Sequence, residues 1–237
     1  MSEIKTTTMS MEDIKKVCSN LDYSAALVYN ATPDMVKQAC ADAKQMKYAA
    51  VPVFPSYIKM VAEELQGTNI APQCVVGFPS GGEHTVVKAK IAEQGVLDGA
   101  KEFDMVINVG RLIAKDYKYV TEDVRAVVEV AHANNITVKG IIEVGFLTDE
   151  DKLAAVECLA EAGADFVKTC TGFAEGKATI HDMTLLKKAA NGRLKVKASG
   201  GVTCLEDGLA MMAAGADRVA GRNPITNQLR AMGITSL

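Results

Sequence analysis

The stretch Ala162-Gly-Ala-Asp-Phe-Val-Lys168 decides the fold. It recurs with changes as Asp98-Gly-Ala-Lys-Glu-Phe-Asp104 and as Ala214-Gly-Ala-Asp-Arg-Val-Ala220. In each copy, a glycine of the kind that ends a helix precedes a tight turn and a short run typical of a buried strand. The repeat indicates a chain built from successive strand–helix units.

Apolar runs that predict strands recur along the whole chain, with helical patterns between them. The eight predicted strands are residues 25–29, 49–54, 74–77, 103–109, 137–143, 166–169, 194–198 and 218–221. Helix starts are predicted at Thr32-Pro33, at Thr121-Glu122 and at Thr148, where Asp151 completes a capping box. After Thr121, apolar residues fall on one helical stripe, namely Val124, Val127, Val128 and Ala131.

Eight strand–helix units without a linker predict an α/β fold, a single-domain (βα)8 TIM barrel. We expect residues 1–20 to form a helical lead-in and residues 21–237 to form the barrel, which is the catalytic domain. The alternative is a doubly wound open sheet, but no Gly-x-Gly-x-x-Gly follows the first predicted strand.

Composition narrows the class of partners. The 237 residues are 49% apolar and carry a net charge of −3, which favours neither nucleic acid nor an acidic membrane surface. Met1-Ser-Glu-Ile-Lys5 has no apolar signal core, and no apolar run approaches the length of a membrane span. The six cysteines are scattered without metal-like spacing, so we expect reduced thiols in a cytoplasmic protein.

Two lysines interrupt apolar strand-like runs, Lys168 on the sixth predicted strand and Lys197 on the seventh. Such strands are buried on both faces, and burial favours the neutral amine that attacks a carbonyl to form a Schiff base. Asp104 and Lys139 lie on the two preceding strands. Any one of these lysines could instead point outward or cap a helix, and this alternative stays open.

In such a reaction, one of Lys168 and Lys197 would be the nucleophile and the other its charged partner. At a separation of about 5 Å and an effective dielectric constant of about 20, their repulsion is roughly 3 kcal/mol, or about two pKa units. One lysine would become neutral near physiological pH while Asp104 holds the other protonated. Asp104 is the natural proton relay.

Glycine-containing loops follow the last three predicted strands, at 169–172, 199–201 and 221–223. Backbone amides after strands seven and eight, beside a helix that begins at Asn223-Pro224, are typical of the phosphate site of a (βα)8 barrel. Asn223 has a second interpretation as the N-cap residue of that helix.

These segments resemble the deoxyribose-phosphate aldolase family of class I aldolases, from about residue 32 to about residue 219. The strongest matches are Gly77-Phe-Pro79, Phe103-Asp-Met-Val-Ile-Asn-Val-Gly110, Ile141-Ile-Glu-Val-Gly145, Gly163-Ala-Asp-Phe-Val-Lys-Thr-Cys-Thr-Gly-Phe173 and Val196-Lys-Ala-Ser-Gly-Gly-Val202. The resemblance implies a (βα)8 barrel that reversibly cleaves 2-deoxy-D-ribose 5-phosphate to acetaldehyde and D-glyceraldehyde 3-phosphate.

The resemblance also implies roles for particular residues. Lys168 would form the Schiff base, Lys197 would tune it, and Asp104 would relay protons. Lys139 matches a further active-site lysine. The substrate- and phosphate-contacting positions that match are Thr171, Gly172, Gly200 and Gly201. No metal or other cofactor is implied, because the imine itself accepts the electrons; His84, His132 and His181 are isolated and expected at the surface or on helices.

The chain departs from the family pattern where substrate would bind. Asp22-Tyr-Ser-Ala-Ala26 stands where the family has Asp-His-Thr-Leu-Leu, so Asp22 and Ser24 keep polar roles. Pro52 replaces a cysteine. Ala220-Gly-Arg-Asn223 stands where the family has Gly-Thr-Ser-Ser, so hydroxyls are lost and a guanidinium is gained.

Three functions therefore remain open. The first is the deoxyribose-phosphate aldolase, with Arg222 and Asn223 near the phosphate. The second is a class I aldolase of the same family in which Arg222 binds another anionic substrate. The third, a non-catalytic barrel, is disfavoured because a binding protein gains nothing from buried lysines. We expect a small phosphorylated aldehyde or sugar phosphate as substrate, no nucleic acid or membrane partner, and a homodimer as an open possibility.

Overall fold

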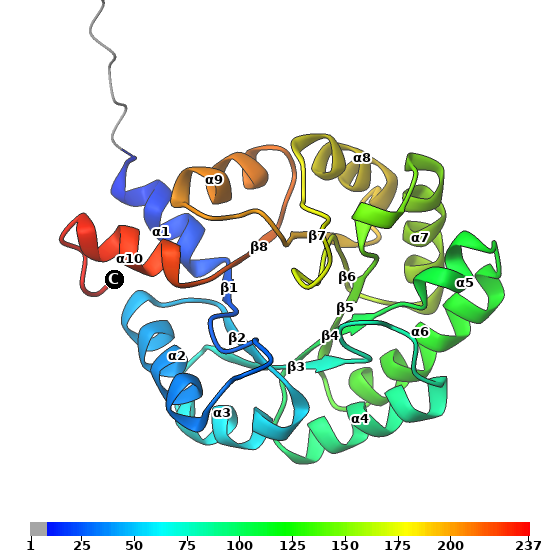
Figure 1. Ribbon diagram of the computed structural model, residues 1–237, viewed down its shortest axis with the longest axis horizontal. Coiled ribbons are helices and arrows are strands. Elements are labelled where there is room, and N and C mark those ends of the chain that lie inside the picture. The colour runs from blue at the N-terminus through cyan, green and yellow to red at the C-terminus, as the bar shows by residue number, and fades with distance from the viewer. Residues whose placement is uncertain (1–8) are drawn as a thin grey trace, which may run out of the picture.

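Eight parallel strands alternate with helices and close into a barrel in the order β1 to β8, with the helices outside (Figure 1). The structure, a computed structural model, describes residues 9–237. The strands are β1 Leu21–Tyr23, β2 Ala50–Val53, β3 Ala71–Val76, β4 Glu102–Val106, β5 Thr137–Ile141, β6 Phe166–Lys168, β7 Lys195–Ala198 and β8 Arg218–Gly221. The prediction of a (βα)8 TIM barrel is confirmed.

The helices are α1 Met11–Ser19, α2 Pro33–Met46, α3 Ile58–Glu64, α4 Thr85–Leu97, α5 Val109–Ile113, α6 Tyr117–His132, α7 Asp149–Ala162, α8 Ile180–Ala190, α9 Leu205–Ala213 and α10 Asn223–Ala231, with 3₁₀ turns η1 Pro55–Tyr57 and η2 Val144–Phe146. Their apolar faces pack against the outward side chains of the strands and form one continuous core. None of the helices in residues 9–237 is long and apolar enough to cross a bilayer.

The first strand differs from the prediction. β1 is Leu21–Tyr23, and it pairs with β8 through Leu21 and Val219. Residues 25–29 form a loop instead. The inward-facing Asp22 interrupts the apolar pattern of the true strand, whereas Ala26 and Leu27 are apolar because the loop packs them inside, where both are almost fully buried.

The other strands were placed correctly with small errors at their ends, and β8 matches the prediction at both ends. The largest overrun is on β4, which ends at Val106 because Asn108 caps α5. The prediction of a helix start at Thr121 was wrong, since α6 begins four residues earlier, at Tyr117. Asp116 accepts from the Tyr119 amide and caps that helix.

Two other helix signals are confirmed. Thr32 caps α2 with Pro33 in the first turn, and Thr148 and Asp151 form the capping box of α7. The stripe predicted on α6 is buried. The repeated glycines Gly99, Gly163 and Gly215 all adopt positive φ, at 93°, 85° and 121°, so each can reverse the chain between a helix and the next strand.

The predicted lead-in contains α1, which begins after the N-cap Ser10. The first eight residues of that prediction, including Met1-Ser-Glu-Ile-Lys5, lie outside the described part of the chain. Among residues 9–237 all six cysteines are free thiols, and only Cys204 is not buried.

Candidate active site

Asp104 holds two lysines inside the barrel through one oxygen atom. Its Oδ2 accepts from Lys168 Nζ at 2.6 Å and from Lys197 Nζ at 2.8 Å. The two lysines are register neighbours on β6 and β7. The exposed fractions are 3% for Lys168 and 0% for Lys197 and Asp104, so the alternative of outward-pointing lysines is excluded.

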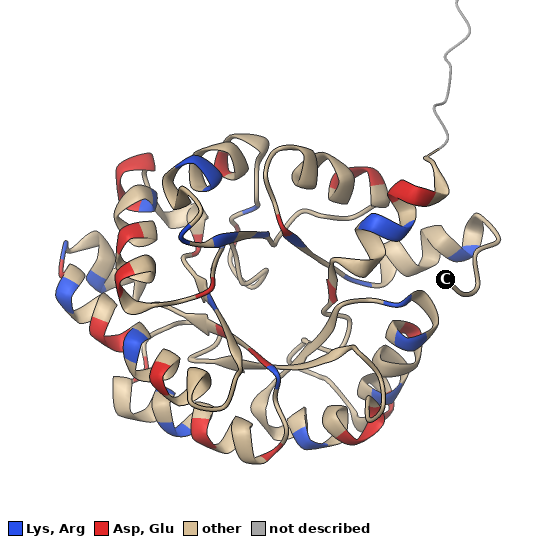
Figure 2. Cartoon of the chain, turned by 180° about the vertical axis from the view of Figure 1, so that it is seen from behind, with Lys and Arg blue, Asp and Glu red and all other residues tan. Residues whose placement is uncertain are grey.

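A second layer of charges lies beside this triad. Lys139 is the register neighbour of Asp104, and its Nζ lies 3.6 Å from Asp104 Oδ1 and 3.5 Å from Asp22 Oδ2. Asp22 Oδ2 also pairs with Lys197. Figure 2 shows basic and acidic positions on the strands that surround the centre of the barrel. All four charged residues predicted from strands four to seven therefore converge, and Asp22 joins them from β1.

Two members of this layer were missed by the sequence analysis. Arg218 on β8 donates to Asp22 Oδ1 with its Nε at 2.9 Å, and its Nη2 lies 3.1 Å from Glu102 Oε2. Glu102 also pairs with Lys139. Glu102 could have been identified from the sequence, because it lies two residues before Asp104 and therefore on the same face of the strand.

The carboxylates are held ionised by these cations. Burial alone would raise the pKa of Asp104, but Lys168, Lys197 and Lys139 outweigh it and hold that pKa well below its usual range. The pKa of Asp22 is lowered in the same way, against burial, by Lys139, Lys197 and Arg218.

The lysines respond in opposite directions. Burial lowers the pKa of Lys197 to about 8, even though Asp104 and Asp22 favour its charged form. At Lys139 burial also works to lower the pKa, but Asp22, Glu102 and Asp104 outweigh it and raise the pKa above its ordinary value. One lysine of the site is therefore able to lose its proton close to neutral pH while another stays charged.

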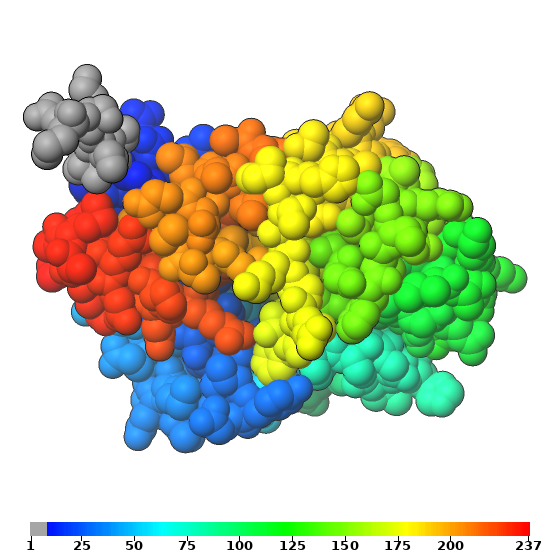
Figure 3. All heavy atoms as spheres, turned by 45° about the horizontal axis from the view of Figure 1, so that its top comes forward, coloured from blue at the N-terminus to red at the C-terminus, as the bar shows by residue number. Residues whose placement is uncertain are grey.

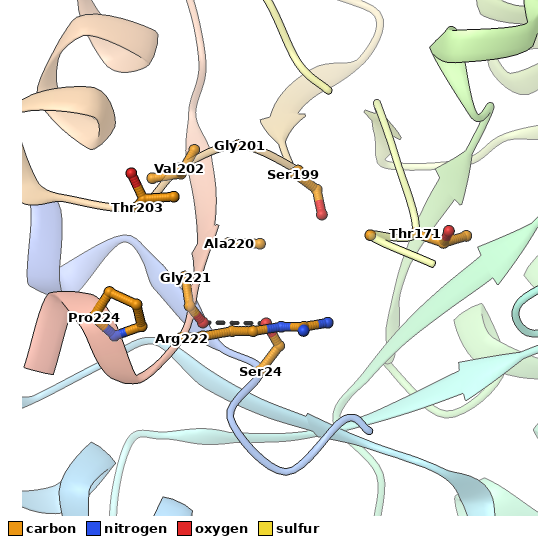
Figure 4. Close-up of a pocket in the computed structure, with 12 residues that line it drawn as sticks. Ser24, Thr171, Ser199, Gly201, Val202, Thr203, Ala220, Gly221, Arg222 and Pro224 are labelled. Carbon is orange, nitrogen blue, oxygen red and sulfur yellow. Dashed lines mark hydrogen bonds between the residues drawn. The ribbon is translucent and has the colours of Figure 1, made fainter. Parts of the chain in front are cut away.

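The three predicted glycine-containing loops meet at one pocket of about 220 Å³ at the carboxyl ends of the strands (Figure 4). Its lining includes six predicted site residues: Ser24, Thr171, Gly172, Gly200, Gly201 and Arg222. Gly200 and Gly201 both adopt positive φ, at 88° and 84°, which leaves their backbone close to the pocket without a side chain. Ser24 Oγ donates to the Gly221 carbonyl.

Arg222 reaches across this pocket toward Thr171 (Figure 4). Its guanidinium carbon lies 6.0 Å from the centre of the Phe173 ring. No carboxylate of residues 9–237 forms an ion pair with Arg222, so the guanidinium is not engaged as a surface ion pair.

Asn223 does not line this pocket, and neither do the five charged residues of the barrel interior, Asp22, Asp104, Lys139, Lys168 and Lys197. Asn223 Oδ1 accepts from Tyr23 Oη at 2.7 Å, which ties the end of β1 to the start of α10. The N-cap interpretation was wrong, because Arg222 is the N-cap residue and Asn223 is the first residue of the helix.

Glu143 is a further residue that sequence reasoning did not select. It is 3% exposed and adopts a left-handed backbone with φ 52°. Its Oε2 accepts from the Thr171 amide at 3.0 Å and from the Thr171 hydroxyl, so it fixes the side chain that lines the pocket. A non-glycine residue in this conformation is a feature that sequence does not reveal.

An aromatic cluster made of Tyr29, Phe54, Phe78 and Phe173 covers the mouth of the barrel from the loops after β1, β2, β3 and β6. Phe173 packs edge-on against Tyr29 at 4.7 Å and against Phe78 at 5.0 Å between ring centres. In the space-filling view the yellow segment after β6 lies against the blue segment after β1 (Figure 3). The cluster therefore links the loops after β1, β3 and β6.

The histidines lie apart from the site. His84, His132 and His181 are exposed, as expected, and the last two pair with Asp165 and Asp149. Among residues 9–237, no three His, Cys, Asp or Glu side chains converge so as to hold a metal ion.

Comparison with known proteins agrees with this geometry. Residues 10–236 match the family model described as DeoC/LacD family aldolase. The chain is 44% identical to the deoxyribose-phosphate aldolase of Thermotoga maritima over 88% of this chain and 82% of that protein. It is 41% identical to the deoxyribose-phosphate aldolase of Thermococcus kodakarensis over 86% and 92% of the two chains.

Solved structures show the same likeness. The chain superimposes on QR15, described as an aldolase, with a TM-score of 0.85 and 33% identity over 94% and 98% of the two chains. A deoxyribose phosphate aldolase from Aeropyrum pernix, described as a tetramer, gives a TM-score of 0.82 at 24% identity, over 94% and 100%, which shows the shared fold. The family model and the relatives agree over nearly the whole chain, which belongs to the DeoC/LacD family of aldolases.

Proposed function

We propose that this chain is a class I aldolase that reversibly cleaves 2-deoxy-D-ribose 5-phosphate to acetaldehyde and D-glyceraldehyde 3-phosphate. The observation that carries the proposal is the sharing of Asp104 Oδ2 by Lys168 and Lys197 inside the barrel. A buried amine beside a second amine and a carboxylate is the arrangement that imine chemistry requires.

Lys168 is the nucleophile in this proposal. Its neutral amine adds to the C1 carbonyl of the open-chain sugar, and loss of water gives the imine. Removal of the C3 hydroxyl proton then breaks the C2–C3 bond, releases D-glyceraldehyde 3-phosphate and leaves the electron pair in an enamine. Protonation of the enamine carbon and addition of water return acetaldehyde and the free amine.

Asp104 and Lys197 move the protons of this sequence. Asp104 Oδ2 touches both amines, so it can accept a proton from one and return it to the other. The pKa of Lys197, lowered to about 8 by burial, lets it give and take a proton near neutral pH. Lys139, whose pKa is raised, remains the fixed positive charge of the set.

The pocket formed by Gly200, Gly201 and Arg222 would receive the phosphate. Backbone amides of the loop after β7 and the start of α10 suit an anion, and the free guanidinium of Arg222 supplies the charge. Thr171, which Glu143 holds in place, lines the same pocket.

The test uses acetaldehyde and borohydride. Reduction of the imine should leave a two-carbon adduct on Lys168, and peptide mass spectrometry locates it. An adduct found only on other lysines would rule out this nucleophile. Cleavage of 2-deoxy-D-ribose 5-phosphate, followed by the release of acetaldehyde, tests the substrate separately from the chemistry.

A second candidate is an aldolase of the same family with a different anionic substrate. The observation that favours it is Arg222, which stands where the family pattern has hydroxyls and reaches across the pocket. A panel of phosphorylated, carboxylated and uncharged aldehydes distinguishes the two candidates by kcat/KM.

The setting of the enzyme also belongs to this proposal. We infer a cytoplasmic location, supported by six free thiols in the described part of the chain. A homodimer is a separate, open proposal. Light scattering on the purified protein measures the mass, and a monomer or a tetramer would contradict the dimer.

A further inference from the structure

The charged residues inside the barrel form one closed set, called here the interior charge cluster. Its members are Asp22, Glu102, Asp104, Lys139, Lys168, Lys197 and Arg218. Within residues 9–237, every ion pair that a member makes is with another member. The set is deeply buried, and its most exposed side chains are Arg218 at 16% and Glu102 at 13%.

Few other ionisable groups face this cluster. The Cys74 thiol of β3 lies beside Gly95 of α4, outside the barrel, and burial raises its pKa to about 12, so it stays neutral. Lys195 on β7 is exposed, and its Nζ lies 5.5 Å from the centre of the Phe166 ring, while Lys139 Nζ lies 5.7 Å from the same centre. The ionisation of the cluster is therefore decided mainly among its own members.

With every member ionised, the cluster has three negative and four positive charges, and so an excess of one. A net charge in a buried site is unfavourable, and loss of one proton to solvent removes it. Arginine does not give up its proton in proteins, so the proton must come from a lysine. The cluster thus favours one neutral amine.

We propose that Arg218 is the positioning residue that creates this excess and so sets the pH at which one lysine of the cluster becomes neutral. The inference rests on the proposed Schiff-base chemistry of the same site. Arg218 does not reach the reacting amines; it acts through Asp22, whose Oδ1 it occupies while Lys197 uses Oδ2. Without Arg218 the set is balanced at three against three, and Asp22 is free to stabilise the lysines.

Glu102 has the opposite effect in this scheme. It neutralises part of the charge of Lys139 and Arg218, and its removal raises the positive excess from one to two. The lysines would then lose a proton more readily. The two missed residues therefore adjust the same equilibrium with opposite signs, which a purely structural role would not produce.

The experiment measures the reactivity of the neutral amine directly. A 1,3-diketone, 2,4-pentanedione, adds to a neutral amine with loss of water and forms an enaminone that is followed by its absorbance. The rate is recorded against pH for the wild type, Arg218→Gln, Arg218→Lys and Glu102→Gln. Arg230→Gln is the matched control, because it breaks an arginine–aspartate pair outside the barrel, with Asp42.

Arg218→Gln should raise the pH midpoint by about one to two units, the effect of a unit charge roughly 7 Å away at an effective dielectric constant of about 20. Glu102→Gln should lower the midpoint, whereas Arg218→Lys and Arg230→Gln should leave it within about 0.3 unit, below the smallest effect expected for a lost charge. Circular dichroism confirms that each variant is folded.

An unchanged or lowered midpoint in folded Arg218→Gln overturns the inference, and so does a raised midpoint in Glu102→Gln. If Arg218→Gln does not fold, the sign of the shift in Glu102→Gln still decides. A wild type that reacts with the diketone but does not cleave the sugar phosphate would contradict the proposed substrate and leave the role of Arg218 intact.

Discussion

Asp104→Asn should destabilise the protein strongly near neutral pH and by less at alkaline pH. The substitution keeps the size of the side chain but removes the carboxylate that Lys168 and Lys197 both contact through a single oxygen. The amide can accept from one ammonium, while its own N–H groups face the other. Removing one partner of a buried ion pair in this way costs about 3–5 kcal/mol.

The dependence on pH follows from the protons bound by each state. Without Asp104 the folded protein gives up lysine protons at lower pH than the wild type does, whereas the unfolded chains bind lysine protons equally. Since the free energy of unfolding rises with pH wherever the unfolded state binds more protons, the variant regains stability as pH rises from about 7 to 10.

Urea unfolding followed by circular dichroism at pH 7 and pH 10 measures this effect, because the chain has no tryptophan for fluorescence. Asp116→Asn is the control: it weakens an exposed pair with Arg111, asparagine can still cap α6, and the loss should stay below about 1 kcal/mol at both pH values. A loss below about 1 kcal/mol at pH 7 for Asp104→Asn, or one that grows with pH, would refute the reasoning. In turnover, kcat should fall far more than KM rises, because a relay acts on the transition state.

Three further predictions follow the same logic. Lys168→Arg should abolish both turnover and the borohydride adduct, because a guanidinium stays protonated and cannot form the imine. The unfolding midpoint should change little, because the guanidinium can still pair with Asp104. Residual turnover by this variant would contradict the assignment of Lys168 as the nucleophile. Arg222→Ser should weaken the binding of a phosphorylated substrate roughly 10- to 150-fold, as for a lost charged hydrogen bond, and leave an uncharged aldehyde unaffected; equal losses for both would show that Arg222 does not bind the anion. Asp22, whose pKa is held far below its usual range, contributes stability that is present above about pH 4 and is lost as pH falls; Asp22→Asn should therefore unfold with a flatter dependence on pH between about 2 and 5, and an unchanged slope would contradict this.

The barrel was predictable because its signals are local. The Ala-Gly-Ala-Asp repeat marks the passage from helix to strand in a few adjacent residues, and the glycines adopt the positive φ that this passage requires. The first strand was not predicted correctly, because its middle residue is Asp22, a charged residue inside the barrel that breaks the apolar pattern.

The site was predictable only in part, for a related reason. Lys168 and Lys197 stood out because apolar residues flank them, whereas Arg218 follows an acidic residue at a strand end and looks like a surface residue in sequence. Its burial depends on the register that places it beside Lys197, and register between strands far apart in the chain cannot be read from local pattern. Glu143 was also not predicted, because its role depends on its left-handed backbone conformation.

The residues that carry out the reaction and the residue expected to select the substrate lie in different parts of the barrel. The lysines, Asp104 and Asp22 lie on strands, where the closed barrel fixes them and a change of one charge alters the ionisation of all the others. Arg222 lies at the end of β8, in a loop that touches none of the interior charge cluster within ion-pair distance. A substitution there can change the anion that is bound while the pH at which the amine reacts stays the same. A chain that keeps the interior of its family and alters this loop is therefore expected to retain the reaction and to differ in the substrate, and the comparison of phosphorylated with uncharged aldehydes measures that difference directly.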